Sequence, residues 1–159
     1  MSLRELTQDE LTRISDAFIL AIKAHEGSFR GDGVPYVSHP IRIALHALSL
    51  GMPTDTVIAS VLHDVVEDTD ISLSVIIEEF GEQVGAMVKA LSKPPRGTPD
   101  RTRIYKEQLL SGPSDARRIK LLDIQDNLSD VDDFMDLKAA AEYRNSREAL
   151  ADILRASLS

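Results

Sequence analysis

Residues 62–70 have the sequence LHDVVEDTD, which places five ionisable side chains in nine positions. They directly follow the apolar run 57–61, which predicts a buried helix. Burying His63 or Asp64 without compensation costs free energy, so another group must neutralise or bind them. The simplest candidate is a divalent metal ion, which accepts an imidazole nitrogen and a carboxylate oxygen together. Two ligands do not complete a metal site, so the rest of the chain has to supply others.

The length and composition predict a helical protein. The chain has 159 residues, and because no repeat or linker divides it, we expect residues 1–159 to form one domain. Hydrophobic residues make up 43% of the chain and aromatic residues 4%, with no Trp, so the core must be aliphatic. This composition favours packed helices over a β-sandwich, and we expect a single all-α bundle of about seven to eight helices.

Charge and cysteine content exclude several classes of protein. Without cysteine, the chain has no disulfide and no thiolate metal ligand, which is typical of a reducing cytoplasm. The net charge of −8 argues against nucleic-acid binding, which needs a basic surface. No signal peptide is visible, and no apolar stretch reaches the roughly 18 residues of a membrane span. We therefore expect a soluble, cytoplasmic protein without a membrane partner.

Helix boundaries place two histidines at defined positions. Thr7 and Glu10 fit a capping box, and the apolar stripe behind them includes His25, which is interpreted as a core histidine bonded to backbone. Ser38 is predicted to cap a helix whose first turn contains His39. His39 is therefore a candidate ligand at a helix start.

The helix that Thr54 or Asp55 is predicted to cap is expected to continue into residues 62–70. With continuous helical geometry, His63 would share one face with Glu67, and Asp64 would share one face with Asp68.

A proline-rich loop at 93–103 carries four cations, Lys93, Arg96, Arg101 and Arg103. The loop is either a solvated linker or a cationic flap over an anionic ligand.

A third helix, 116–128, contains Asp123 between two apolar neighbours. Three separated helices then offer two imidazoles and two carboxylates, which suit Mn²⁺, Fe²⁺, Zn²⁺ or Mg²⁺. Such a site with room for water is a hydrolase arrangement, because the metal lowers the pKa of water and polarises a phosphoryl oxygen. The alternative is a buried charge network without metal, which often costs stability relative to apolar packing.

The pattern of His39, His63-Asp64 and Asp123 resembles the HD superfamily of metal-dependent phosphohydrolases. The blocks 24–40, 62–69 and 119–127 are similar to the hydrolase domain of the RelA/SpoT enzymes and to their small stand-alone relatives, the small alarmone hydrolases. This resemblance runs from about residue 20 to residue 130. It implies an all-α fold, one bound Mn²⁺, and removal of the 3′-pyrophosphate from ppGpp or pppGpp to give GDP or GTP.

The resemblance also implies roles for individual residues. The implied metal ligands are His39, His63, Asp64 and Asp123. Glu67 and Asp68 match an acidic pair that positions or activates the attacking water. Arg30 matches an arginine that reaches toward the substrate, and Asn127 matches a residue near the nucleoside.

The chain departs from the family pattern at four positions. Gly31 and Asp32 stand where a lysine and a small polar residue are common, Ile124 stands where Arg or Lys is usual, and Asp126 replaces His or Tyr. Because these changes remove positive charge, they favour a second hypothesis, a phosphatase of the same fold acting on NADPH or nucleoside monophosphates. A third hypothesis is a non-catalytic nucleotide-sensing module. In each case we expect a stand-alone module, and self-association through a helix face stays open.

Overall fold

The computed structural model describes residues 5–31, 33–129, 131 and 135–159. Within these ranges the regular elements are all helical: α1 (Gln8–Ala24), α2 (Ser38–Ser49), α3 (Thr54–Leu62), α4 (Val65–Asp68), α5 (Leu73–Phe80), α6 (Glu82–Leu91), α7 (Arg101–Ser111), α8 (Ser114–Ser129) and α9 (Leu137–Ala156). The all-α prediction is confirmed. The described part of the chain has nine helical segments, one more than the upper expected number. The additional segment is α4, which is a single turn of four residues.

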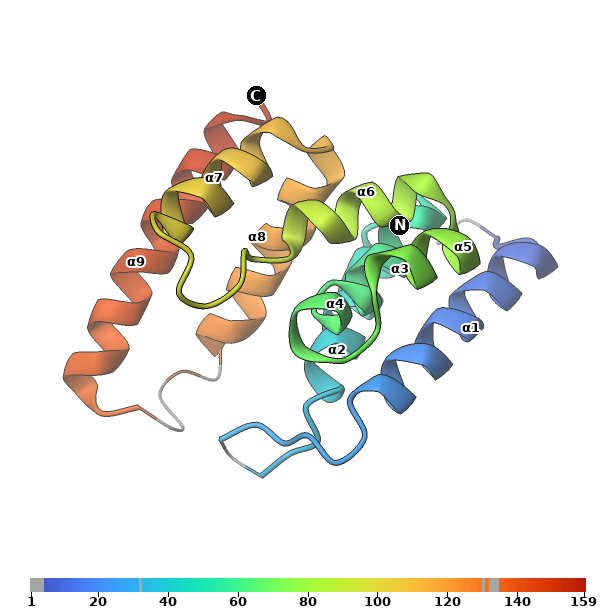
Figure 1. The fold of residues 1–159 in the computed structure, drawn as a ribbon, viewed down its shortest axis with the longest axis horizontal. Helices are drawn as coiled ribbons and strands as arrows, with labels where there is room; N and C mark the ends of the chain where they lie inside the picture. Colours follow the sequence, from blue (N-terminus) through green and yellow to red (C-terminus); the bar gives the residue numbers. More distant parts are fainter. Residues whose placement is uncertain (1–4, 32, 130, 132–134) are drawn as a thin grey trace.

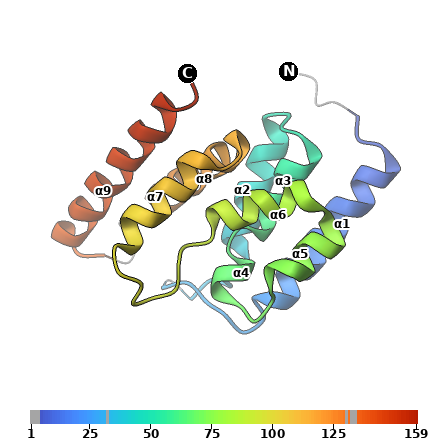
Figure 2. The same ribbon diagram turned by 45° about the horizontal axis from the view of Figure 1, so that its top comes forward.

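Helix α3 lies at the centre of the molecule (Figure 1). Eight of its nine residues are buried, because α1, α2, α6 and α8 all pack against it. A helix that is apolar all round is stable only when other elements cover every side. On the far side of α8, helix α9 runs along α8, with α7 beside the pair (Figures 1 and 2). The core is therefore aliphatic, as the composition predicts.

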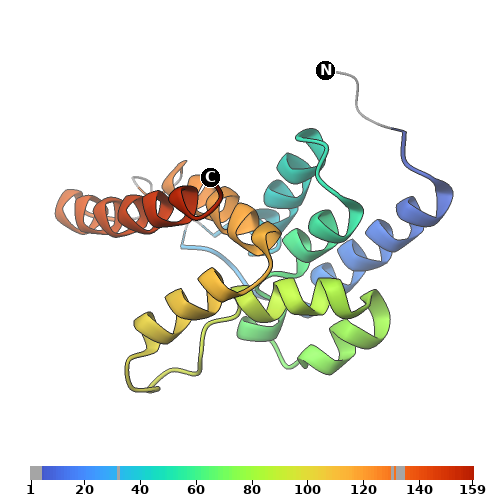
Figure 3. The same cartoon turned by 90° about the horizontal axis from the view of Figure 1, so that it is seen from above.

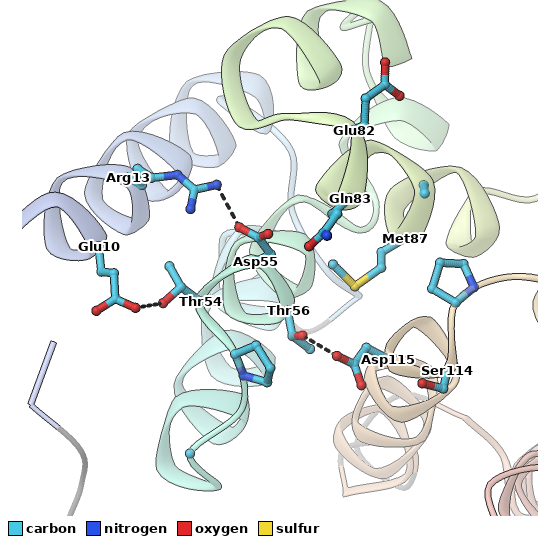
Figure 4. A pocket seen from close by; sticks show the side chains of 14 residues that line it. Glu10, Arg13, Thr54, Asp55, Thr56, Glu82, Gln83, Met87, Ser114 and Asp115 are labelled. Carbon is cyan, nitrogen blue, oxygen red and sulfur yellow. Dashed lines mark hydrogen bonds and ion pairs between the residues drawn. The ribbon is translucent and has the colours of Figure 1, made fainter. Parts of the chain in front are cut away.

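Polar contacts tie the N-terminal end of α3 to its neighbours (Figure 4). These contacts are Arg13 with Asp55 (2.7 Å), Thr54 with Glu10 (2.6 Å) and Thr56 with Asp115 (2.8 Å). The prediction that Thr54 or Asp55 caps α3 is wrong. Pro53 occupies the cap position, and the Thr54 and Asp55 side chains bind α1 instead.

The capping box of Thr7 and Glu10 at the start of α1 is confirmed. The predicted Ser38 cap of α2 is wrong by one residue. The turn before α2 is already hydrogen-bonded, with the amide of Ser38 donating to the carbonyl of Pro35, so the helix begins at Ser38 itself. His39 still lies in the first turn, as predicted.

The expectation of one continuous helix through residues 62–70 is wrong. Helix α3 ends at Leu62, and His63 and Asp64 form a turn before α4. His63 Nδ1 donates to the Ser60 carbonyl (2.8 Å), which is the carbonyl that would accept from the Asp64 amide in a continuing helix. The amide of Asp68 nevertheless donates to the Asp64 carbonyl (2.9 Å), so these two acids stay one turn apart.

No helix in the described part of the chain combines the length and the apolar character that crossing a membrane requires.

Gly85 in α6 allows a test of the packing between α5 and α6. A Cβ at this position would lie 2.3 Å from Cγ1 of Ile77. Gly→Ala in an open helix interior stabilises by about 1 kcal/mol. We expect Gly85→Ala to lower the free energy of unfolding by about 1–3 kcal/mol instead, because the β-branched side chain of Ile77 cannot move aside easily. Urea denaturation measures this change.

The matched background is Ile77→Ala, which removes the clashing atoms. In that background Gly85→Ala should become neutral or stabilising. An equal loss of stability in both backgrounds would show that the packing against Ile77 is not the cause.

Candidate metal centre

The four predicted metal ligands come together from three parts of the fold. His39 lies in the first turn of α2, His63 and Asp64 lie in the turn after α3, and Asp123 lies in the middle of α8. The donor atoms of His39, His63 and Asp123 lie within 4.8 Å of one another. Asp64 Oδ2 is 3.0 Å from His63 Nε2 and 3.9 Å from His39 Nε2. Donor atoms at this spacing can share one ion at metal–ligand distances of roughly 2.0–2.2 Å.

Both imidazoles present Nε2 to the cluster. His63 Nδ1 donates to the Ser60 carbonyl, so this nitrogen carries a proton and Nε2 is the nitrogen that can bind a metal when the imidazole is neutral. His63 Nε2 is buried and has no hydrogen-bond partner among the described residues. His39 Nδ1 lies 2.6 Å from Asp126 Oδ2, which orients its Nε2 in the same way. This donor set fits a divalent metal ion.

A buried lysine balances part of the negative charge. Lys120 on α8 donates to Asp123 Oδ2, and both side chains are almost fully buried. Burial alone would lower the pKa of Lys120, but the adjacent Asp123 carboxylate raises it above its usual value. Burial alone would raise the pKa of Asp123, and Lys120 with the two histidines holds it well below its usual range. Asp123 is therefore ionised.

The second carboxylate of the cluster is also held in its charged form. His63 and the Tyr36 hydroxyl keep the pKa of Asp64 low in spite of its burial. Burial lowers the pKa of His63, but the adjacent Asp64 carboxylate raises it more, and the net effect is a rise to about 9. Metal binding at this cluster has to displace that proton.

Tyr36 connects the cluster to Asp68. Its hydroxyl lies 2.6 Å from Asp64 Oδ2 and 3.2 Å from Asp68 Oδ2. Burial and the nearby Asp64 raise the pKa of Asp68, which makes this carboxylate a better proton acceptor than a solvated one. His25 packs against the Tyr36 ring, with the ring centroids 4.9 Å apart. His25 is buried as predicted, but its Nε2 has no hydrogen-bond partner in the described ranges.

Glu67 points to the loop after α6. Its carboxylate accepts from the backbone amide of Lys93 (3.0 Å) and from Lys93 Nζ (3.1 Å), and Arg101 Nη2 lies 3.5 Å away. Arg101 and Arg103, which were expected in the loop, lie in the first turn of α7, and Arg96 and Arg103 are exposed. Glu67 thus holds Lys93 and Arg101 near the site, and the other two cations face solvent.

A cavity of about 290 Å³ opens over the metal cluster. Its lining includes the predicted substrate residues Arg30 and Asn127, whose side chains are joined by a 3.3 Å hydrogen bond. Gly31 and Ile124, two of the departures from the family pattern, line the same cavity, and Asp32 lies outside the described residues. The basic residues of the lining are Arg30, Lys93, Lys120 and Arg147.

A larger hollow of about 970 Å³ lies at the N-terminal end of α3 (Figure 4). Its ionisable lining residues are Glu10, Arg13, Asp55, Glu82 and Asp115, and the contacts drawn there tie helices together. It lies at the opposite end of α3 from His63, so we assign the candidate site to the smaller cavity.

Four residues of the site were missed as participants by sequence reasoning: Tyr36, Lys120, Asp126 and Arg147. Lys120 had a local signal, because it precedes Asp123 by three helical positions, where opposite charges pair. Asp126 was noted only as a departure from the family pattern. Tyr36 and Arg147 reach the site through tertiary packing, for which the sequence carries no local signal.

Comparison with known proteins places this geometry in context. A family model described as "HD domain" matches residues 17–103. The chain is 36% identical over 120 residues to a guanosine-3′,5′-bis(diphosphate) 3′-pyrophosphohydrolase of Aquifex aeolicus, covering 74% of this chain and 17% of that protein. It is 31% identical over 143 residues to a probable GTP pyrophosphokinase of Mycobacterium leprae, covering 88% and 18%. The chain thus spans less than a fifth of the length of these relatives.

A solved structure resembles the whole fold. It is the structure of a metazoan ortholog of SpoT that is described as hydrolysing ppGpp and as playing a role in starvation responses. The TM-score is 0.76 at 26% sequence identity, and the match covers 98% of this chain and 88% of that chain.

The contact between Asp126 and His39 predicts a loss of metal affinity on mutation. Arg42 holds Asp126 through two bonds of 2.7 Å, and Asp126 in turn orients His39. We expect Asp126→Asn to weaken the binding of Mn²⁺ or Zn²⁺ by about 10- to 100-fold, because partners of metal-bound histidines have effects of this size. Calorimetric titration of the metal measures the change.

The control is Asp55→Asn, which breaks an ion pair with Arg13 at the other end of α3. If Asp126→Asn bound the metal as tightly as Asp55→Asn, Asp126 would have no part in orienting His39.

Proposed function

Because this chain belongs to the HD domain family, we propose that it is a metal-dependent phosphohydrolase that removes the 3′-pyrophosphate from ppGpp or pppGpp. The observation that carries the proposal is the meeting of two imidazole Nε2 atoms and two carboxylates next to a cavity that His39, Asp64 and Asp123 line together with basic residues. Residues 1–159 would act as one HD domain.

The relatives support this choice of substrate. A. aeolicus carries a relative named as a 3′-pyrophosphohydrolase of guanosine-3′,5′-bis(diphosphate), and the SpoT ortholog of similar fold is described as hydrolysing ppGpp. A protein of Escherichia coli that is 35% identical over 88 residues is named a bifunctional (p)ppGpp synthase/hydrolase.

In this proposal His39, His63, Asp64 and Asp123 hold one Mn²⁺, and Fe²⁺, Zn²⁺ or Mg²⁺ also suit the donor set. The ion supplies Lewis acidity toward a phosphoryl oxygen and toward the attacking water. Lys120 and Tyr36 keep the two carboxylates ionised and oriented, as their contacts with Asp123 and Asp64 indicate.

Asp68 and Glu67 complete the proposed chemistry. Asp68 lines the cavity and takes a proton from water as the water oxygen bonds to the phosphorus next to the ribose. The bond from that phosphorus to O3′ then breaks, O3′ takes up a proton from solvent as it leaves, and Asp68 returns the proton it accepted to solvent. Glu67 acts indirectly, because its carboxylate positions the Lys93 ammonium group at the edge of the cavity. Arg30 and Asn127 would contact the nucleotide.

A second candidate is a phosphatase of the same fold that acts on NADPH or nucleoside monophosphates. Gly31 and Ile124 favour it, because they line the cavity where the family carries more positive charge. This enzyme would release free phosphate from these substrates, whereas the first candidate releases pyrophosphate from ppGpp.

Asp64→Ala tests whether the centre is catalytic at all. With purified protein we expect Mn²⁺-stimulated release of pyrophosphate from ppGpp, and we expect Asp64→Ala to abolish it, because the variant loses one carboxylate ligand. Circular dichroism should show the same helix content for both proteins. If the protein is a non-catalytic sensing module, the wild type itself would bind ppGpp without releasing pyrophosphate.

Asp68→Asn tests the proton acceptor. We expect kcat to fall by about 10²- to 10⁴-fold with little change in KM, because general-base catalysis contributes this much and the amide cannot accept the proton. Asp70→Asn, an exposed acid two positions on, is the matched control. Equal activity of the two variants would remove Asp68 from the mechanism.

A further inference from the structure

Another cavity, of about 370 Å³, is lined by Lys93 and by residues of α7 and α9. Figures 2 and 3 show the course of these two helices. Four basic residues line it: Lys93, Arg101, Lys106 and Arg147. Among the described residues that form its wall there is no Asp or Glu. In a chain with a net charge of −8, this is a local concentration of positive charge.

The positive charge of this cleft is only partly compensated. Lys93 and Arg101 both interact with the single carboxylate of Glu67. The Arg147 guanidinium lies over the Tyr143 ring, with 4.7 Å between Cζ and the ring centroid. Within the described ranges neither Lys106 nor Arg147 forms an ion pair with a carboxylate. An anion in the cleft would remove the repulsion between these cations.

The Tyr105 ring forms part of the wall, and the residue is 6% exposed. The ammonium groups of Lys93 and Lys120 each lie 5.6 Å from the centre of its ring. Tyr105 therefore lies between the cleft and the buried Lys120 of the metal site.

The cleft adjoins the cavity over the metal cluster. Lys93 and Arg147 line both cavities, so the two spaces meet at these side chains. A ligand with two anionic ends could place one end at the metal ligands and the other between α7 and α9.

We propose that the cleft between α7 and α9 binds the 5′-diphosphate or 5′-triphosphate of the nucleotide while its 3′-pyrophosphate lies at the metal centre. This inference rests on the proposed function, which supplies a nucleotide with two phosphorylated ends. It also accounts for the cations absent at Gly31 and Ile124, because the positive charge of the site is concentrated on α7, α9 and the loop before α7. Lys106 is the diagnostic residue, since it lines this cleft and not the metal cavity.

The experiment compares Lys106→Glu with Lys23→Glu, the same charge reversal at an exposed position of α1 far from the cleft. Two substrates are used: ppGpp, and guanosine 3′-diphosphate, which lacks the 5′ phosphates. We expect Lys106→Glu to raise KM for ppGpp about tenfold with kcat nearly unchanged, and to leave KM for guanosine 3′-diphosphate unaltered. An unchanged KM for ppGpp, or an equal rise for both substrates, would overturn the proposal.

A binding measurement separates this proposal from the proposed function. Inorganic pyrophosphate is titrated calorimetrically into the metal-free protein in the presence of EDTA. We expect Lys106→Glu to weaken its binding about tenfold relative to Lys23→Glu. If the wild type fails to hydrolyse ppGpp but this difference is found, the substrate is wrong and the anion site stands. If ppGpp is hydrolysed and pyrophosphate binds equally to both variants, the cleft is not an anion site.

Discussion

The burial of α3 on every side is the constraint from which the rest of the structure follows. The C-terminal end of this covered helix lies in the interior, so the chain that follows Leu62 begins among buried residues. His63 and Asp64 are the first of these residues. Their burial is tolerated because α2 and α8 bring His39 and Asp123 to the same point. The packing that stabilises the fold therefore also assembles the donor set.

The buried carboxylates of Asp64 and Asp123 are stabilised by two kinds of partner, side chains that stay in place and a proton that a metal ion can replace. Lys120 is a permanent cation beside Asp123, and the Tyr36 hydroxyl is a permanent donor to Asp64. The Asp64 carboxylate raises the pKa of His63 to about 9 in spite of its burial. Because a metal ion binds the neutral imidazole, a divalent ion would displace this proton, whereas Lys120 stays beside Asp123.

Local patterns predicted the parts of the structure that depend on neighbouring residues. The capping box of α1 and the position of His39 in a helix start follow from residues within one turn of each other. The break after Leu62 was missed, because it depends on a buried imidazole bonded to the Ser60 carbonyl. The sequence shows Asp126 only as a departure from the family pattern. Its contact with His39 is not predicted, because the two residues are 87 positions apart in the sequence. Contacts of this range leave no periodic trace in one sequence.

Helix α9 differs from the other elements in how it is attached. It packs mainly on α8, lies beyond the residues that match the HD family model, and contributes Arg147 to both cavities. The metal ligands, by contrast, all lie on or next to the helices that surround α3. In the function we propose, reaction chemistry and nucleotide preference would then be carried by different pieces of the chain. Exposed residues of α9 can change while its buried Ala151 and Leu154 keep it packed on the core, so evolution could alter which nucleotide is accepted and leave the predicted metal ligands in place.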